Sequence, residues 1–362
     1  MLLGSARLAW LALVFLGASG WATAEAENCR IAFDMGSSGI RAGQLHGQRT
    51  PKADIDFLAP LAAGRSLVET MDPAVAALRD LPRQGNFAAG CTQVGGGFSA
   101  WRLALLRDPG ALIPSLWRIR AQTGVAVLVV PQAQEGRYGY FAARQVLGAG
   151  LTSSHVLDIG GGSLQVAGED SVFGLPFGQK TWRAHLCRVV FGRSPDCPLQ
   201  NISGRELAHA RAEARKQLVG ARHLPAGMSL TAISRPLSRG VLPAVRQLTA
   251  SVQPAAVLEL PALRQAIERA AGLSASRLAE DSGLLPRFSA YLLSDMLLVE
   301  ALMVQAGLES LTVAEADLTN LPGLLADEQA FRWADNYACY LSRLAVLGID
   351  AYASDVGTCP AY

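Results

Sequence analysis

The chain has 362 residues, of which 50% are apolar and 17% are charged, so it can bury sizeable cores, and the composition excludes an intrinsically disordered protein. This length is typical of two domains. The formal net charge is only +2, which argues against duplex nucleic acid or an anionic membrane as a partner, so a polyanionic substrate would need a local basic pocket.

Residues 1–24 have the pattern of a secretory signal peptide. Arg7 is their only charged residue, an apolar run covers 8–17, and residues 22–24 form an A-x-A cleavage pattern. An uncleaved membrane anchor is the alternative, but the apolar run is short for a bilayer span. We therefore expect an exported protein, periplasmic or secreted, that keeps no stable membrane span after signal cleavage.

Six cysteines follow the leader, and an even number of cysteines in an exported chain favours disulfides. The sequence alone does not choose among the possible pairings. Local pairs are the simplest expectation, namely Cys187–Cys197 and Cys339–Cys359, which leaves Cys29–Cys91. A metal site is the weaker interpretation, because neither a C-x-x-C motif nor a histidine cluster accompanies the cysteines.

Predicted strands and helices alternate through the first part of the mature chain. The strands are expected at 29–34, 40–45, 54–58, 91–94, 125–130, 156–159 and 164–167. The helices are expected at 72–81, 99–106, 112–123 and 134–147. The first of these helices has Asp72 as its expected N-cap and Pro73 in its first position.

The chain beyond residue 200 is predicted to be mostly helical. Helices are expected at 204–218, 236–250, 261–271, 288–306 and 327–347, with short strands at 229–233 and 310–313. The order of strand, glycine turn and strand occurs twice, at 31–45 and 156–167, which indicates an α/β protein with a duplicated domain. We expect a first domain over 25–152 and a second domain, with a helix-rich C-terminal part, over 153–362.

The first glycine turn carries groups that can bind phosphate. Gly36 lacks a Cβ, so backbone N–H groups can close on a phosphate oxygen. Ser37 and Ser38 add hydroxyl donors and Arg41 adds positive charge. Asp34, at the end of the strand, can hold a metal ion or its water. An ordinary hairpin turn is the competing interpretation, since glycine and serine are common in turns.

The second glycine turn repeats the pattern. Asp158 ends a buried strand and is followed, after one residue, by Gly160, Gly161, Gly162 and Ser163. Three glycines in a row are costly in conformational entropy, and an acid beside a phosphate loop suits Mg²⁺. An ordinary turn would have to occur twice with the same D-x-G pattern, so the pair of turns favours phosphate binding.

The two loops resemble the twin phosphate loops of the actin, hexokinase and heat-shock ATPase superfamily. Within it, their spacing resembles the exopolyphosphatase/guanosine-pentaphosphate phosphohydrolase family, whose motifs are D-x-G-S-N-S-x-R, A-x-R-x-A, E-E-A-R and D-I-G-G-G-S-T-E. The matching segments here are, in order, 34–41, 100–104, 134–137 and 158–163, and residues 311–313, 318 and 323–325 are similar to the family's closing segment. The resemblance thus covers nearly the whole mature chain.

The resemblance implies two ribonuclease-H-like α/β domains with a cleft between them, and Mg²⁺-assisted attack of water on a terminal phosphorus. It implies that Glu135 is the general base and that Arg102 joins the two loops in binding phosphates. Asp34, Asp158 and Gln165 are the implied metal-binding positions. From the residues alone, Glu135 would be interpreted as an ordinary solvated helical glutamate.

The chain departs from the family pattern at several positions of the site. The family's Asn is Ser38, the first of its paired glutamates is Gln134, the Glu after the second loop is Gln165, and an Arg after Leu318 is Thr319. The leading hypothesis is an exopolyphosphatase, and a secreted nucleoside tri- or diphosphatase is the enzymatic alternative. The departures favour a third hypothesis, a non-catalytic phosphate or polyphosphate sensor. A homodimer stays open, because the sequence does not fix the oligomeric state.

Overall fold

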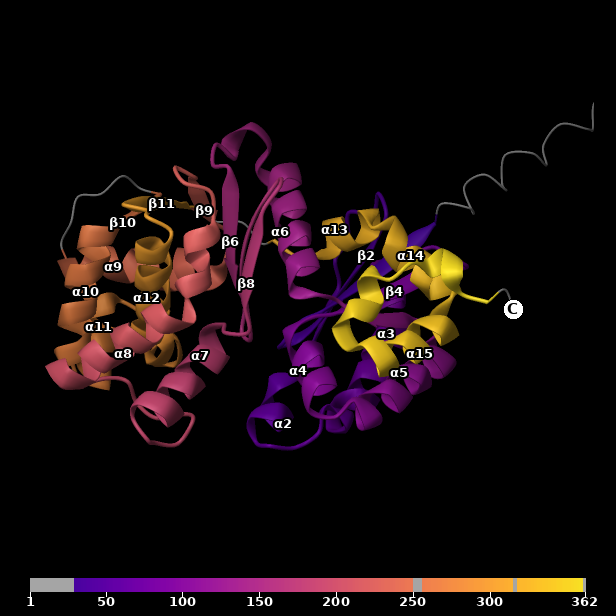
Figure 1. Ribbon diagram of the computed structural model, residues 1–362, viewed down its shortest axis with the longest axis horizontal. Helices are drawn as coiled ribbons and strands as arrows, with labels where there is room; N and C mark the ends of the chain where they lie inside the picture. The colour runs from indigo at the N-terminus through magenta and orange to yellow at the C-terminus, as the bar shows by residue number, and fades with distance from the viewer. Residues whose placement is uncertain (1–28, 250–255, 315–317, 361–362) are drawn as a thin grey trace, which may run out of the picture.

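The computed structural model describes residues 29–249, 256–314 and 318–360. The predicted leader and the last residue of the predicted helix 236–250 lie outside these ranges. Two α/β domains, each built around one sheet, lie side by side (Figure 1). Helix α6 (Gln132–Leu147) lies between them and packs on the second sheet, although the sequence placed it in the first domain.

The first sheet has the strand order β3-β2-β1-β4-β5. Its strands are β1 (Arg30–Met35), β2 (Gly39–Gln44), β3 (Lys52–Asp54), β4 (Thr92–Gly97) and β5 (Ala126–Val129). The pairs β3-β2 and β2-β1 are antiparallel, and the pairs β1-β4 and β4-β5 are parallel. Consecutive residues of β1 and β5 are buried because both faces of this sheet are covered, which explains their uninterrupted apolar runs.

Strand β4 continues beyond its predicted end at residue 94 and includes all three glycines that follow. This strand lies inside the sheet, between β1 and β5, and leaves little room for side chains. A Cβ on Gly97 would lie 2.7 Å from Cγ of Trp101, and one on Gly96 would lie 2.9 Å from Cδ2 of Leu324. These glycines therefore permit close packing against β4.

The second sheet has the order β10-β11-β9-β6-β7-β8. Its strands are β6 (His155–Ile159), β7 (Leu164–Gly168), β8 (Val172–Leu175), β9 (Leu230–Ala232), β10 (Val257–Glu259) and β11 (Ser310–Val313). The run β8-β7-β6-β9-β11 repeats the order and the strand directions of the first sheet, and β10 adds an antiparallel edge. The predicted two-domain α/β fold with a duplicated core is confirmed.

Helices surround the two sheets. In the first domain these are α2 (Leu58–Ala62), α3 (Met71–Gly85), α4 (Ser99–Arg107) and α5 (Pro109–Thr123). In the second they are α7 (Gln179–His185), α8 (Gly204–Gln217), α9 (Leu242–Thr249), α10 (Leu260–Gly272), α11 (Ala275–Ser282) and α12 (Pro286–Gln305). Short 3-10 or π turns are η1 (Leu67–Thr70), η2 (Gly148–Gly150), η3 (Leu186–Val190), η4 (Val219–His223), η5 (Leu237–Val241), η6 (Gly348–Ala353) and η7 (Val356–Thr358).

Several predicted elements differ from those observed. In place of the predicted strand 54–58, the structure has β3, which ends at Asp54, and then α2, which begins at Leu58. The predicted helix 327–347 is two helices, α14 (Glu328–Asp335) and α15 (Tyr337–Leu347), with a break at Asn336. The helix α3 starts one residue earlier than predicted, with Thr70 and not Asp72 in the N-cap position, and it ends before Asn86, whose φ of 55° is left-handed.

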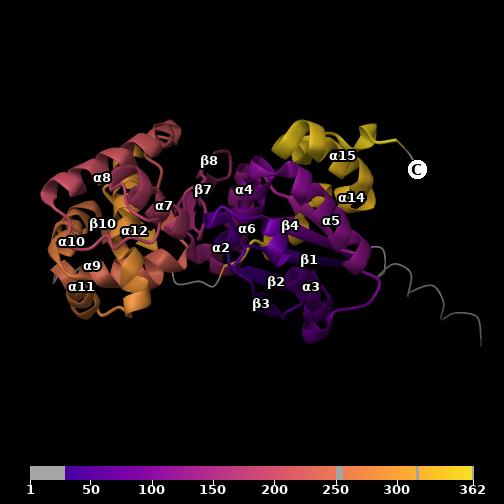
Figure 2. The ribbon, with the colours of Figure 1, turned by 90° about the horizontal axis from the view of Figure 1, so that it is seen from below.

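The C-terminal segment returns to the first domain, so the predicted second domain 153–362 is wrong at its end. Leu324, Trp333 and Tyr340 belong to the same buried core as Phe33 and Leu128. Figure 2 shows α15 beside α5, and α14 packs on β4 and β5. The apolar faces of these helices reveal that they are buried, but the sequence does not say which of two similar sheets they cover.

The cysteines form three disulfides, in the pairs that local pairing predicts. The Cα–Cα distances are 4.6 Å for Cys29–Cys91, 5.7 Å for Cys187–Cys197 and 6.0 Å for Cys339–Cys359. Three disulfides fit an oxidising compartment. Among the described helices, α12 alone has the length and apolar content to cross a membrane, but most of it is buried in the second core, as expected of a core helix.

Candidate active site

The two glycine loops occupy equivalent places in the two sheets. In the hairpin β1–β2, Asp34 lies opposite Arg41, and in the hairpin β6–β7, Asp158 lies opposite Gln165. An equivalent backbone hydrogen bond closes each loop. The Gly36 nitrogen donates to the Gly39 oxygen at 3.0 Å, and the Gly160 nitrogen donates to the Ser163 oxygen at 2.9 Å. Each central strand therefore ends in a carboxylate and a glycine loop.

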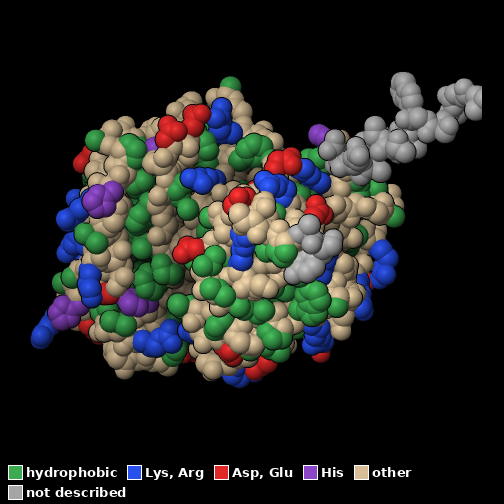
Figure 3. Space-filling view, turned by 45° about the vertical axis from the view of Figure 1, so that its right-hand side comes forward, with side chains coloured by type: hydrophobic (Ala, Val, Ile, Leu, Met, Phe, Trp, Pro, Cys, Tyr) green, Lys and Arg blue, Asp and Glu red, His purple; other side chains and the backbone are tan. Residues whose placement is uncertain are grey.

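A cleft of about 340 Å³ brings the two loops together. The first hairpin contributes Asp34, Gly36, Ser37, Ser38 and Arg41, the second contributes Asp158, Gly160, Gly161 and Ser163, and α6 contributes Glu135. On the face of the molecule in Figure 3, basic and acidic side chains are interspersed, without an extended basic area. Within the cleft, positive charge comes from Arg41, Lys180 and Arg235.

Helix α7 begins directly on the second loop. The nitrogens of Gln179 and Lys180 donate to the carbonyl oxygens of Gly160 and Gly161, both at 2.9 Å. A Cβ on Gly178 would lie 2.2 Å from the Gly160 oxygen, so only glycine fits at this position. This attachment brings Lys180 to the cleft, where its Nζ also lies 3.0 Å from a carboxylate oxygen of Asp56 in the first domain.

Glu135 is held by groups from both domains. Its side chain is buried, and its Oε2 accepts from Nη2 of Arg102 at 2.7 Å and from Nε2 of Gln165 at 2.9 Å. Arg102 also donates to the Val130 oxygen at 3.0 Å and to the Ser163 hydroxyl at 3.2 Å. Both bonds to Glu135 end at Oε2, and Oε1 accepts no hydrogen bond from the described residues. The side chain is therefore fixed in orientation while Oε1 can still accept a proton.

Three predicted site residues lie behind the cleft. Arg102, predicted to bind phosphate, and Gln165, predicted as a metal ligand, both contact Glu135 and do not line the cleft. Gly162 packs on the Leu58 and Ser99 side chains and is likewise absent from the cleft lining. In this structure Arg102 and Gln165 orient Glu135, and Asp34 and Asp158 remain as candidates for holding a metal.

The pKa values of the two loop aspartates are raised. Burial raises the pKa of Asp34 to about 6, opposed by the Asn320 N–H that donates to its Oδ2 at 3.0 Å. Burial is the largest cause that raises the pKa of Asp158 to about 7, and repulsion from Glu135 and Asp34 adds to it. Carboxylates crowded in this way favour a cation between them.

This arrangement fits Mg²⁺ shared with a substrate. The described residues include no group of three His, Cys, Asp or Glu side chains that could enclose a metal ion. Mg²⁺ commonly uses one or two carboxylates and takes its other ligands from phosphate oxygens and water. Asp34 and Asp158 supply such a pair at the ends of two strands.

Several cleft residues were not singled out as site residues from the sequence. They are Gln179, Lys180, Ser234, Arg235 and Asn320. Lys180 could have been found from its position after the second hairpin, where a helix N-terminus is expected near a phosphate loop. Asn320 follows Thr319, which marks a departure from the family's closing segment, and no sequence pattern indicates Ser234 or Arg235.

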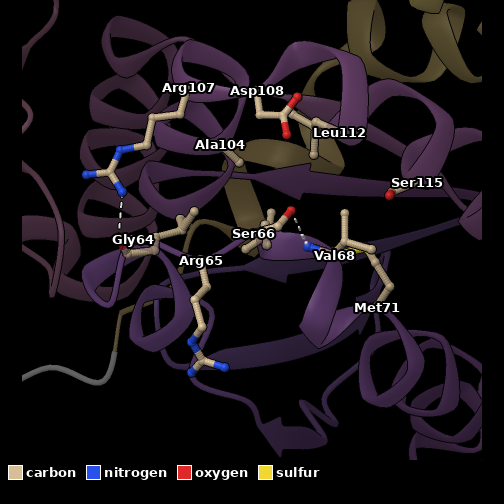
Figure 4. Close-up of a pocket in the computed structure, with 12 residues that line it drawn as sticks. Gly64, Arg65, Ser66, Val68, Met71, Ala104, Arg107, Asp108, Leu112 and Ser115 are labelled. Atoms are coloured by element: carbon tan, nitrogen blue, oxygen red, sulfur yellow. Dashed lines mark hydrogen bonds between the residues drawn. The ribbon is translucent and has the colours of Figure 1, made fainter.

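A second cavity, of about 330 Å³, lies in the first domain between α4, α5 and the segment that follows α2. Figure 4 shows its polar groups. The Arg107 guanidinium donates to the Leu61 oxygen, Ser66 accepts from the Val68 nitrogen, and Asp108 caps α5 at Ala111. Because these side chains already form hydrogen bonds to nearby backbone atoms, few of the polar groups in the cavity can bind a ligand.

Neither a protein-family model nor a curated protein matches this sequence. Solved structures do match. The Aquifex aeolicus member of the Ppx/GppA family is 14% identical with a TM-score of 0.61, covering 82% of this chain and 96% of its own. An exopolyphosphatase from Cytophaga hutchinsonii is 13% identical with a TM-score of 0.58, covering 85% of this chain and 98% of its own. The protein therefore has the two-domain, actin-like fold of the Ppx/GppA structures.

Proposed function

We propose that this protein is an exported phosphohydrolase that removes the terminal phosphate from inorganic polyphosphate by Mg²⁺-assisted attack of water. The observation that carries the proposal is the convergence of Glu135, Asp34 and Asp158 in one cleft between two glycine loops. The fold shared with an exopolyphosphatase structure supports this substrate class. The disulfides and the leader pattern support export.

Glu135 is the proposed general base. Arg102 and Gln165 hold its Oε2, so Oε1 accepts the proton from a water molecule in the cleft. The water oxygen forms a bond to the terminal phosphorus while the bond from phosphorus to the bridging oxygen breaks. The shortened chain leaves with that electron pair, and inorganic phosphate is released. Phosphoryl transfer asks for positioning and charge neutralisation more than for covalent chemistry, and these groups supply both.

The loops and their neighbours bind the phosphate chain in this proposal. Ser37, Ser38 and Ser163 offer hydroxyl donors, and Lys180 of the second domain offers a charged donor. Asp34 and Asp158 would hold Mg²⁺, which when bound neutralises charge on the phosphate oxygens. The chain's own contribution is to hold the terminal phosphorus at a fixed distance from Glu135.

The sensor hypothesis loses part of its support from the contacts of Gln165. The resemblance implies a metal ligand at this position, but the Gln165 amide donates to Glu135 at 2.9 Å and to the Ser163 hydroxyl at 2.8 Å. A glutamate at this position could not donate either bond unless it were protonated. The substitution is thus compatible with catalysis.

Phosphate release separates the candidate functions. Mature, oxidised protein would be incubated with polyphosphate, tripolyphosphate and ATP, each with Mg²⁺ and each with excess EDTA. We expect Mg²⁺-dependent release that is fastest from polyphosphate. Preference for ATP would move the assignment to a nucleoside phosphatase. Tight polyphosphate binding without release from any compound would instead identify a sensor.

A further inference from the structure

Asp327 is the centre of a hydrogen-bond cluster behind the first turn of α6. Its Oδ2 accepts from the Tyr138 hydroxyl at 2.6 Å, from the Tyr352 hydroxyl at 2.8 Å and from Nε2 of Gln134 at 2.9 Å. The two tyrosine hydroxyls also lie 2.7 Å apart. Because Tyr138 and Tyr352 are almost completely buried, these bonds have little competition from water.

The cluster is adjacent to the proposed base. Gln134 directly precedes Glu135, and Tyr138 lies nearly one turn later on the same helix. Both side chains that Asp327 holds on α6 therefore flank Glu135 on either side along the chain. Asp327 itself lies between α13 (Leu321–Ala326) and α14, and its Oδ1 caps α14 by accepting from the Gln329 nitrogen at 2.8 Å.

The segment 320–327 connects this cluster to the metal-binding side of the cleft. At its start the Asn320 nitrogen donates to Oδ2 of Asp34 at 3.0 Å, and at its end is Asp327. Between them, α13 packs directly on α6: a Cβ on Gly323 would lie 2.5 Å from Cα of Tyr138. One short, tightly packed segment thus contacts Asp34 at one end and the helix of Glu135 at the other.

The cluster also explains why position 134 carries a neutral glutamine. The amide of Gln134 donates to Asp327, whereas a glutamate there would place a second carboxylate about 3 Å from the first. Two ionised carboxylates at this distance repel each other. The neutral residue at position 134 is therefore what allows Asp327 to hold the start of α6.

We propose that Asp327, with Tyr138 and Tyr352, is a positioning residue that fixes the distance between Glu135 and Asp34. This inference rests on the proposed function, in which Glu135 takes a proton from water at a phosphate held near Asp34. The cluster touches neither substrate nor water in that reaction. It acts by holding the first turn of α6 against the segment that contacts Asp34.

The test compares two buried tyrosines of the C-terminal segment. Tyr352→Phe removes one hydroxyl of the cluster. Tyr337→Phe is the matched control, because Tyr337 is also 4% exposed and its hydroxyl donates to the Val127 oxygen at 2.9 Å, away from α6. Asp327→Asn is the second test variant, since asparagine also serves well as an N-cap.

We expect Tyr352→Phe and Asp327→Asn to lower kcat for polyphosphate on the order of 10-fold to 100-fold, with KM within about 2-fold, because small misplacement of a catalytic group has effects of this size. Tyr337→Phe should lower the melting temperature similarly and keep kcat. Equal losses of kcat in both tyrosine variants would overturn the proposal in favour of general packing. Unchanged kcat in Tyr352→Phe and Asp327→Asn would overturn it as well.

Hydrogen exchange of the wild type and the variants gives a readout that does not need activity. Peptides covering 132–139 should exchange several-fold faster in Asp327→Asn and Tyr352→Phe than in Tyr337→Phe. Equal exchange in all three variants would overturn the positioning role. A wild type that hydrolyses no phosphoanhydride would refute the proposed function, and the exchange data would still decide whether Asp327 fixes the start of α6.

Discussion

Gln165 and Glu135 are joined by a hydrogen bond of 2.9 Å from the Gln165 amide nitrogen to Oε2 of Glu135. The bond links β7, in the hairpin of the second loop, to α6, and Arg102 from the first domain donates to the same oxygen. The proposed base is therefore oriented by one donor from each domain. Its position depends on how the two domains are placed relative to each other.

Replacing Glu135 by Gln should abolish most turnover and preserve binding. Glutamine keeps the shape of the side chain but cannot accept a proton from water, and loss of a general base commonly lowers the rate by about 10²–10⁴-fold. Polyphosphate affinity should change little, because the loops make the phosphate contacts. Phosphate-release kinetics and equilibrium binding measure the two quantities. Glu69→Gln, at an exposed surface ion pair, is the control, and full activity of Glu135→Gln would show that the base is assigned wrongly.

Replacing Gln165 by Glu distinguishes the two roles considered for this position. If the residue orients Glu135, a carboxylate there repels the ionised base and moves the acidic limb of the kcat/KM profile to higher pH. If the residue is a metal ligand, the variant should instead need less Mg²⁺ for half-maximal activity. We expect the first result, measured as pH profiles at saturating Mg²⁺. A lower Mg²⁺ requirement with an unchanged pH profile would restore the metal-ligand assignment.

The sequence predicted those parts of the site that depend only on residues close together in the chain. Each loop follows a buried strand and carries its aspartate, so Asp34 and Asp158 could be identified from spacing, and the fold repeats the same hairpin twice. The local disulfides Cys187–Cys197 and Cys339–Cys359 were accessible for the same reason. A short separation in the chain limits how far apart two such residues can lie in the fold.

The rest could not be predicted because it depends on which surfaces meet. The apolar pattern of α14 and α15 indicates burial, but two equivalent sheets could receive them. Asp327 has no motif of its own, and its partners Tyr138 and Gln134 are 189 and 193 residues away in sequence. The resemblance predicts a phosphate contact for Arg102, and only the structure shows that its guanidinium, on α4, contacts Glu135.

Replacing Gly178 by Ala should disturb the second loop. The added Cβ would lie 2.2 Å from the Gly160 oxygen and 2.6 Å from the Ser163 nitrogen, both backbone atoms of the phosphate loop. We expect weaker polyphosphate binding and a loss of about 1–3 kcal/mol in the free energy of unfolding, as for other overpacked sites. Calorimetry and equilibrium binding measure these effects. Gly204→Ala is the control, since nothing lies within 4 Å of a Cβ there, and equal behaviour of the two variants would contradict the proposed contact.

Asp295 should make the stability of the protein depend on pH. Burial raises the pKa of this carboxyl on α12 from 3.8 to about 8, opposed by the Gln179 amide that donates to Oδ2 at 2.6 Å. Between these two pKa values the folded state keeps the proton and the unfolded chain has lost it. The free energy of unfolding therefore falls as the pH rises through this interval, by up to about 1.4 kcal/mol per pH unit from this group.

Asp295→Asn tests this linkage, because asparagine keeps the size of the side chain but does not titrate. Its unfolding free energy, measured by denaturant titration between pH 4 and pH 8, should fall less steeply with pH than that of the wild type. The variant should have its greatest advantage over the wild type near pH 8, where the buried carboxyl of the wild type begins to lose its proton. At pH 4 the advantage should be smallest, since the wild-type carboxyl is then protonated in the folded state and close to its pKa in the unfolded chain. Parallel stability curves for the two proteins across this range would show that Asp295 is ionised in the folded protein, paired with a cation or with water, and that burial does not govern its charge.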